Sequence, residues 1–361
     1  MQRSTKLAIL AAAVLAIGPL GAVALGLGAE EAAPPPVTVR LEVEEVEKEI
    51  MGVPYHAWTF NGVVPGPIIR IPQHTQLTID LVNGHTEVHS FHTHIQNYDI
   101  TNDGSSHTVP LSIAPHQADD PLGAVGLTSG HDIHVSTSVN PIGTYIPRED
   151  HDVVPPGGER LYTFQADEVG TFVYHCHVFP VESHINHGLY GLIIVYPPGW
   201  TWDDSGLITP QESNTDAWVT AADGTVYYED VVMIGELDLT GASETASVPT
   251  TQTTGKLFVT NFHTWARPYY LGPVPDGTLM RVVVGNMGQT INSWHIHGHN
   301  FNVLDKFDPQ KRVKERTDVL LVGPGQSFET TLVASHPGFW MVHDHTTTNQ
   351  YAGLMPWLQI T

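Results

Sequence analysis

The two halves of this 361-residue chain carry the same series of motifs, and this repetition constrains the fold more than any other feature. In the first half, HSFHTH at 89–94 is followed far downstream by HCH at 175–177. In the second half, NSWHIHGH at 292–299 is followed by HDH at 343–345. Residues i and i+2 of a β-strand point to the same face, so each His-x-His pair presents two imidazoles to one side. We therefore expect two copies of one strand-built unit.

The remaining sequence is typical of an all-β protein. Short alternating or β-branched runs, such as TQLTIDLVN at 75–83 and LMRVVVGN at 279–286, are punctuated by many of the 33 glycines and 27 prolines. No stretch after residue 40 shows a convincing helical period. We expect two tandem Greek-key β-sandwich domains at residues 37–197 and 216–361, joined by a linker at 198–215.

The first 30 residues read as an export segment. Arg3 and Lys6 precede an uncharged, largely apolar run from residue 7 to 28. The run is long enough to span a bilayer, so a cleaved signal peptide and a retained anchor both stay open. Either one places the folded part outside the cytoplasm, in the periplasm, the pseudoperiplasm or at the cell surface. The formal net charge of −23 argues against nucleic acid and anionic lipid as partners.

The four histidine pairs point to a metal. Imidazole binds copper well, and no carboxylate cluster accompanies the pairs. The pattern therefore predicts a multinuclear copper site with eight imidazole ligands, which are His92, His94, His175, His177, His295, His297, His343 and His345.

The single cysteine, Cys176, lies between two of these histidines and cannot form a disulfide within its own chain. A thiolate with two imidazoles and a weak or absent axial ligand is the donor set of a blue-copper electron-transfer centre. His89 lies three residues before an early pair, and HINHGL at 184–189 follows the cysteine. The candidate set is therefore His89, Cys176 and His184, with His187 as the alternative to His184. The other interpretation is a buried, inert thiol.

These motifs resemble those of the multicopper oxidases, and within them the two-domain laccase-like enzymes, which are related to copper nitrite reductases. The family's signature of a histidine followed by x-x-His-x-His-Gly-His is similar to NSWHIHGHNF, and its His-Cys-His motif with a later His and Gly-Leu is similar to HCH and HINHGL. The resemblance covers residues 37–361 and implies two cupredoxin-like domains. Asn292, Asp344 and Asn349 stand where blue-copper ligands would lie in the second domain. The resemblance thus implies type 1 (blue) copper in the first domain and none in the second.

The resemblance also implies a mechanism and an assembly. About four coppers per chain, one of type 1, one of type 2 and two of type 3, would couple one-electron oxidation of a donor to four-electron reduction of O2 to water. The three-copper cluster would be shared between the subunits of a homotrimer. Leu189, which cannot ligate, would occupy the axial position of the blue copper. Asp103 would serve a proton route to the cluster, although a plain turn aspartate in Asn-Asp-Gly explains it equally.

Other functions stay open at the level of sequence. A copper nitrite reductase shares the two-domain trimer and the blue copper, but its catalytic copper needs three histidines and not the second member of each pair. A copper store or an electron carrier would not need eight paired imidazoles. The electron donor could be a phenol, a metal ion, a small nitrogen compound or a redox protein. Residues 105–152 carry further histidines that could bind another metal or cover the blue copper, and surface histidines are their commoner explanation.

Overall fold

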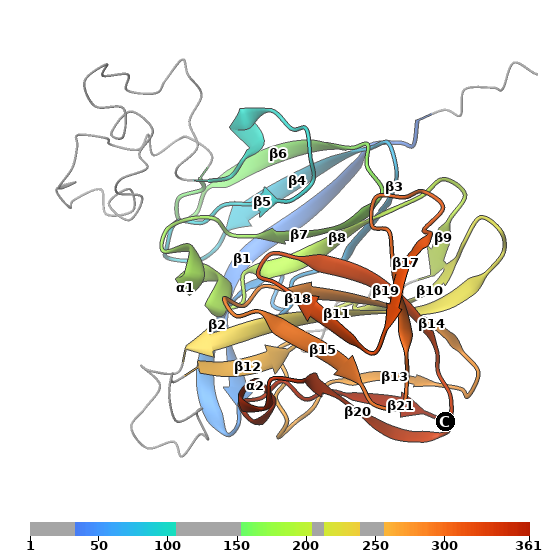
Figure 1. Ribbon diagram of the computed structural model, residues 1–361. Helices are drawn as coiled ribbons and strands as arrows, with labels where there is room; N and C mark the ends of the chain where they lie inside the picture. The colour runs from blue at the N-terminus through green and yellow to red at the C-terminus, as the bar shows by residue number, and fades with distance from the viewer. Residues whose placement is uncertain (1–32, 106–152, 204–212, 239–255) are drawn as a thin grey trace, which may run out of the picture. The chain divides into compact units, whose positions relative to one another are not determined.

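The computed structural model describes residues 33–105, 153–203, 213–238 and 256–361 (Figure 1). The expected export segment, nearly all of the histidine-rich insertion and the middle of the expected linker therefore lie outside the described residues. The chain from Pro34 to Thr361 forms one compact unit. Within the described ranges, no helix is both long enough and apolar enough to cross a membrane.

The N-terminal half consists of two four-stranded sheets. In β4, every second side chain of TQLTIDLVN is buried, which is the alternation expected of a strand with one face on a core. The first sheet has the order β2-β1-β4-β6, formed by β1 (Val37–Ile50), β2 (Val53–Phe60), β4 (Thr75–Asn83) and β6 (Glu159–Ala166). The second has the order β3-β8-β7-β5, formed by β3 (Ile69–Pro72), β5 (His92–Thr93), β7 (Gly170–His175) and β8 (Tyr190–Tyr196).

The C-terminal half also consists of two sheets. The larger has the order β17-β16-β19-β14-β11-β10-β9, with β12 also paired to β11. Its strands are β9 (Thr201–Asp203), β10 (Asp216–Thr220), β11 (Val226–Asp238), β12 (Lys256–Thr260), β14 (Leu279–Asn286), β16 (Phe301–Leu304), β17 (Val313–Thr317) and β19 (Ser327–Val333). The smaller has the order β13-β21-β20-β15-β18, with β13 (Tyr270–Val274), β15 (Asn292–Ile296), β18 (Val319–Val322), β20 (Gly338–Asp344) and β21 (Trp357–Ile360).

The two halves repeat one topology. In the N-terminal half β1 runs parallel to β4, which pairs antiparallel with β6, and β3 runs parallel to β8. In the C-terminal half β11 runs parallel to β14, which pairs antiparallel with β19, and β13 runs parallel to β21. The expected all-β fold with two tandem cupredoxin-like β-sandwiches is therefore confirmed.

The structure differs from the expected all-strand fold and plain linker in its short helical segments and in one additional strand. Two short helices, α1 (Val181–Asn186) and α2 (Thr347–Tyr351), and one 3-10 turn, η1 (Ile100–Asn102), interrupt the strands. They are three to six residues long, which is too short for a helical period to show in the sequence. The expected linker also contains β9, which pairs with β10 in the larger C-terminal sheet.

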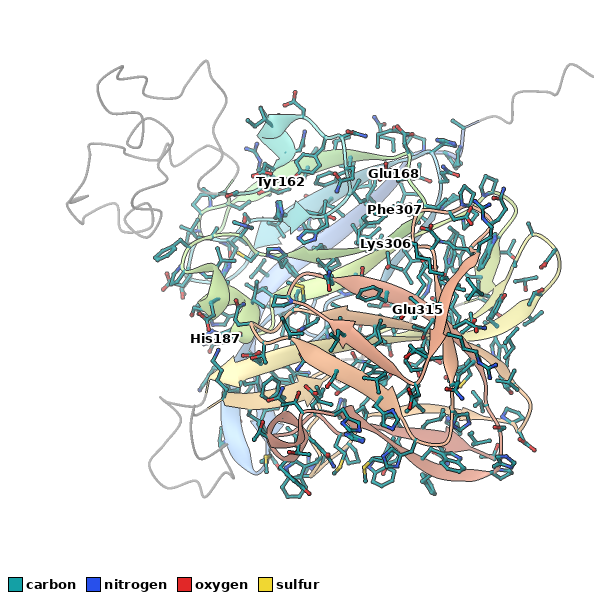
Figure 2. The ribbon with its side chains drawn as sticks, viewed as in Figure 1. Tyr162, Glu168, His187, Lys306, Phe307 and Glu315 are labelled. Carbon is teal, nitrogen blue, oxygen red and sulfur yellow. The ribbon has the colours of Figure 1, made fainter. Side chains whose placement is uncertain are left out.

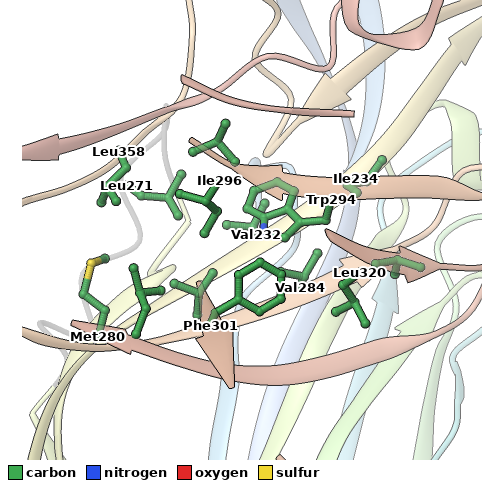
Figure 3. Close-up of a cluster of buried hydrophobic side chains, with 14 of the residues drawn as sticks. Val232, Ile234, Leu271, Met280, Val284, Trp294, Ile296, Phe301, Leu320 and Leu358 are labelled. Atoms are coloured by element: carbon green, nitrogen blue, oxygen red, sulfur yellow. The ribbon is translucent and has the colours of Figure 1, made fainter. Parts of the chain in front are cut away.

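Each half has its own apolar core, and a third core lies where the halves meet. The N-terminal core includes Leu77, Ile79 and Phe164. The C-terminal core is built around Trp294 and Phe301 (Figure 3). The third cluster combines residues of β7 and β8 with residues of β11 and β14, and its members include Leu192, Ile194, Val231, Met233 and Val283.

Charged and aromatic groups reinforce this junction. Arg70 of β3 lies 3.0 Å from Glu229 of β11, and both side chains are almost completely buried. Between β16 and β17, Lys306 places its Nζ 5.0 Å from the ring centroid of Phe172 on β7, with Phe307 beside it (Figure 2). Strands β3 and β7 of the N-terminal half are thus in direct contact with the C-terminal half.

Candidate metal centres

The early and late histidine pairs of the N-terminal half lie side by side. His92 on β5 is directly opposite His175 on β7 in the antiparallel register, and their ring centroids are 5.2 Å apart. His177 lies 4.8 Å from His92, and His94 lies 5.8 Å from His175. The ligand atoms of His92, His94 and His175 all fall within 4.8 Å of one another. The structure therefore brings all four predicted imidazoles together.

The C-terminal half repeats this arrangement. His295 on β15 is directly opposite His343 on β20, with ring centroids 5.4 Å apart. His345 lies 5.3 Å from His295, and His297 Nε2 lies 3.1 Å from His343 Nε2. The same strand register thus produces two four-histidine groups, one in each half.

Backbone carbonyls fix the tautomer of four of these rings. The Nδ1 atoms of His92 and His295 lie 2.6 Å from the carbonyl oxygens of Asp103 and Asp318. Two further contacts of this kind join His175 Nδ1 to Cys176 O at 2.9 Å and His343 Nδ1 to Asp344 O at 2.7 Å. A carbonyl oxygen only accepts, so Nδ1 carries the proton in each ring and Nε2 keeps the lone pair that a metal needs.

Burial favours the neutral form of four of these imidazoles. Burial, followed by the charges of His92 and Lys306, lowers the pKa of His94 to about 4. Burial likewise holds the pKa of His175 well below its usual value. The pKa values of His297 and His343 are also lowered, first by burial. Neutral imidazole is the form that binds a metal ion, so both groups suit one.

Cys176 forms a second kind of centre with two histidines. Its Sγ lies 3.3 Å from His184 Nδ1 and 3.7 Å from His89 Nδ1, and the two Nδ1 atoms are 3.2 Å apart. All three residues are buried. The backbone N–H of Ser90 also approaches Sγ, at 3.4 Å. This is one sulfur and two imidazole nitrogens aimed at a common point, which fits a blue-copper donor set.

The electrostatics of this centre favour a bound cation over a free reactive thiol. Burial raises the pKa of Cys176 to about 11, so the isolated thiol is a poor nucleophile. Burial, together with His184 and His85, lowers the pKa of His89 to about 2. A copper ion here would supply the positive charge that stabilises the thiolate.

The structure places His184, rather than His187, beside Cys176. His184 lies on α1, and His187 at the end of this helix turns its Nδ1 to the carbonyl oxygen of Ser183 at 2.6 Å. The His187 ring stacks on Trp58 with ring centroids 4.3 Å apart. Leu189 is fully buried, and its carbonyl oxygen accepts a hydrogen bond from the Cys176 N–H at 3.0 Å.

Asp103 lies next to the N-terminal histidine group. Its carboxylate accepts a hydrogen bond from the Tyr98 hydroxyl at 2.8 Å and lies 3.7 Å from His92 Nδ1. The side chain is mostly but not completely buried. This position is compatible with a proton route, and the Tyr98 hydroxyl is a partner that the sequence did not indicate.

The position equivalent to Cys176 in the C-terminal half holds a different chemistry. Asp344 is fully buried and accepts hydrogen bonds from Asn292 Nδ2 at 2.8 Å and Asn349 Nδ2 at 2.9 Å. The nearby His299 is engaged at both ring nitrogens, by His297 O at 2.8 Å and by the Ser335 N–H at 3.2 Å. In the C-terminal half, a hydrogen-bonded group of Asp344, Asn292 and Asn349 therefore stands where the N-terminal half has His89, Cys176 and His184.

Sequence reasoning missed the residues that surround His89. Trp58 on β2 contacts the rings of His85, His89 and His184 at centroid distances of 4.7, 5.5 and 5.1 Å. His85 contacts His89 directly, and Glu45 on β1 contacts His85. These residues lie up to 44 positions before His89 and belong to no motif, so only the strand pairing reveals them.

Comparison with known proteins identifies similarity to copper-containing oxidoreductases. The family model described as "Multicopper oxidase" matches residues 34–199 and 238–361. The copper-containing nitrite reductase of Neisseria meningitidis is 29% identical over 165 residues, which are 45% of this chain and 31% of that protein. The chain thus aligns with less than half the length of this curated relative.

Two solved structures from Nitrosomonas europaea share the fold. Its blue copper oxidase superposes with a TM-score of 0.61 at 22% identity, covering 90% of this chain and 85% of that one. Its copper nitrite reductase superposes with a TM-score of 0.60 at 22% identity, covering 90% and 94%.

Proposed function

Because this chain belongs to the multicopper oxidase family, we propose that it is a two-domain, laccase-like oxidase that couples one-electron oxidation of a donor to the four-electron reduction of O2 to water. The main support for the proposal is that the chain contains two complete four-histidine groups and one Cys–His–His centre. Copper would supply electron storage at the Cys176 centre and oxygen reduction at a three-copper cluster.

The chain's own residues would divide the work between two centres. His89, Cys176 and His184 would hold the type 1 copper in a buried pocket, and the buried Leu189, which follows α1, would offer no further ligand atom. His175, Cys176 and His177 are consecutive, so covalent bonds join the sulfur of the first centre to two imidazoles of the second. Asp103, hydrogen-bonded by Tyr98, would hold or pass a proton beside His92.

The proposal includes an assembly. Eight imidazoles divided between two groups in one chain would form a complete cluster when the N-terminal group of one subunit meets the C-terminal group of its neighbour. A head-to-tail contact that closes produces a ring, and we propose a homotrimer. We also propose that the N-terminal segment directs export, which would place this enzyme outside the cytoplasm.

The experiment that tests this function is copper counting together with oxygen uptake on a generic one-electron donor. We expect about four coppers per chain, a blue absorption band, and oxygen consumed without release of peroxide. Light scattering should return the mass of a trimer. About two coppers per chain and no oxygen uptake would contradict the proposal.

Two variants separate the centres. Cys176→Ser should abolish the blue band while the cluster copper remains bound. His345→Gln should keep the blue band and lose oxygen uptake. If both variants keep full oxygen uptake, neither centre takes part in the reaction.

Nitrite reduction is the second candidate, because the relative from Neisseria meningitidis is a copper-containing nitrite reductase. It predicts nitric oxide formation from nitrite by the purified protein. It also predicts that the second member of each histidine pair, such as His345, is dispensable. The His345→Gln variant therefore distinguishes the two functions directly.

A further inference from the structure

A buried imidazole stands directly behind the candidate copper ligand His89. His89 points its Nδ1 toward Cys176 and His184, while its Nε2 lies 2.8 Å from His85 Nδ1. The side chain of His85 is only 6% exposed. On its other edge, His85 Nε2 lies 3.6 Å from Glu45 Oε2. A carboxylate, an imidazole and the ligand imidazole thus form a line that ends at the metal position.

The hydrogen bonds around His85 fix the direction of this line. The backbone N–H of Glu87 points at His85 Nδ1 at 3.3 Å, and a backbone amide only donates. His85 Nδ1 is therefore the acceptor nitrogen, and the ring N–H lies on Nε2, facing Glu45. His89 must then donate from its own Nε2, which leaves the His89 Nδ1 lone pair free toward Cys176.

The strand register holds the line in place and keeps its inner end away from solvent. Glu45 on β1 is directly opposite Trp58 on β2 in the antiparallel ladder. The Trp58 ring packs against both imidazoles, with its centroid 4.7 Å from that of His85 and 5.5 Å from that of His89. The carboxylate of Glu45 is 44% exposed, so the charged end of the line reaches solvent while its inner end does not.

We propose that Glu45 and His85 are positioning residues for the type 1 copper: they fix the ring and tautomer of His89 and lower the reduction potential of the metal. The inference rests on the proposed function, since it requires copper at Cys176. When His85 accepts the Nε2–H of His89, the electron density on the His89 ring increases and its Nδ1 becomes a stronger donor, and the nearby Glu45 carboxylate strengthens His85 as an acceptor. A stronger donor stabilises the oxidised metal more than the reduced metal, which is why the potential falls.

The test compares three variants of the full copper-loaded protein. Glu45→Gln keeps the shape of the side chain and removes its charge. His85→Asn keeps an acceptor at the position of Nδ1 and removes the link to Glu45. His85→Leu removes both. The readouts are the midpoint potential of the blue copper, its electron paramagnetic resonance spectrum, and copper affinity measured by competition with a chelator.

We expect Glu45→Gln and His85→Asn to shift the midpoint potential to more positive values with copper affinity close to wild type. We expect His85→Leu to show the same positive shift and a roughly 10- to 100-fold loss of copper affinity, because the His89 ring is no longer held. Asp167→Asn is the matched control. It alters another carboxylate–imidazole pair, with His74 at 3.1 Å, which contacts none of the candidate ligands.

The outcomes separate this inference from the function on which it rests. A wild-type protein without a blue copper at Cys176 overturns both. A blue wild-type protein whose potential is unchanged in Glu45→Gln and His85→Asn overturns the inference alone. In that case a loss of affinity in His85→Leu would reflect packing, and the proposed oxidase function would stand.

Discussion

At the scale of single residues, Asp344 shows how one position of the repeat has changed its chemistry. It occupies the place of Cys176 in the C-terminal half, between two histidines. Its Oδ1 accepts hydrogen bonds from the Ser293 hydroxyl at 2.6 Å and from the Thr346 N–H at 2.7 Å. Burial acts to raise the pKa of Asp344, but its hydrogen bonds outweigh burial and hold the pKa below its usual value. A satisfied carboxylate thus orders the strand end that carries His343.

Replacing this carboxylate should destabilise the fold. In Asp344→Ala, the buried amides of Asn292 and Asn349 lose their acceptor, and unsatisfied buried donors cost free energy. We expect the free energy of unfolding in urea to fall by about 3 kcal/mol. The exposed Asp203, replaced by alanine, serves as control and should change little. Equal stability of both variants would mean that the network around Asp344 contributes nothing.

The sequence predicted the histidines of the site but not the residues that support them. The i, i+2 spacing was enough to place His92 and His94, or His175 and His177, on one side of a strand. The chain separation of Trp58, His85 and Glu45 from Cys176 leaves no local pattern to detect. Their contacts depend on the pairing of β1 with β2, which a single sequence does not specify.

At the scale of elements, the segment between α1 and β8 determines whether His184 lies beside Cys176. Gly188 in this segment has φ = +119°, and a Cβ there would lie 2.7 Å from Val64 Cγ2 and 2.9 Å from the carbonyl oxygen of Trp58. Neither neighbour can move freely, because Val64 belongs to a core cluster and Trp58 pairs in a sheet. Glycine is therefore required for the close approach that carries His184 and Leu189 inward.

The variant Gly188→Ala should lose the blue band. The added methyl group would push the segment away from β2 and displace His184, and the backbone strain should cost about 2 kcal/mol in unfolding free energy. Absorption at constant copper loading and urea unfolding measure the two effects. Gly157→Ala is the matched control, since Gly157 also has positive φ but no atom within 4 Å of the added Cβ. A blue Gly188→Ala protein would show that the segment tolerates the displacement.

The sequence predicted the strands better than the elements that join them. Alternation over eight or nine residues, as in β4, identifies both the strand and its buried face. The six residues of α1 and the five of α2 are too few for a helical period, and both were missed. The prediction of two similar domains was correct because the early and late histidine motifs lie on the same pair of adjacent strands in each half.

At the scale of the whole molecule, buried charges connect the two halves. Arg70 from the N-terminal half and Arg281 from the C-terminal half both bind Glu229. Arg281 also binds Glu329 at 2.7 Å, and Lys311 binds the other oxygen of Glu329 at 2.7 Å. All of these side chains are at most 4% exposed. Buried pairs of this kind leave costly unpaired charges when one partner is lost, so they specify one arrangement of the strands.

Asp230, the neighbour of Glu229, accepts hydrogen bonds from neutral groups. It is almost fully buried on the wall of a cavity of about 350 Å³, where it accepts hydrogen bonds from the Tyr269 hydroxyl at 2.7 Å and the Gly272 N–H at 3.3 Å. Burial raises the pKa of Asp230 to about 7, and nearby Asp216 adds to this. The hydrogen bonds and the more distant Arg70 oppose the shift without cancelling it.

This raised pKa makes the stability of the protein depend on pH with a definite sign. The unfolded carboxyl loses its proton near pH 3.8, while the folded one keeps it to about pH 7. Between these values the folded state binds more protons, so the contribution of Asp230 is full below pH 3.8 and is lost as the pH rises through 7. Asp230→Asn cannot ionise, so its unfolding free energy relative to wild type should increase by up to about 1.4 kcal/mol per pH unit between about pH 4 and 7, then level off.

Urea unfolding at a series of pH values, with equal copper loading, measures that difference and cancels the contribution of every other titrating group. Asp216→Asn is the informative second variant. It removes a neighbouring negative charge that raises the pKa of Asp230, so the window of pH dependence should end at a lower pH. A difference between Asp230→Asn and wild type that stays flat from about pH 4 to 8 would mean that Asp230 ionises normally. In that case water or a cation in the adjoining cavity would stabilise its negative charge.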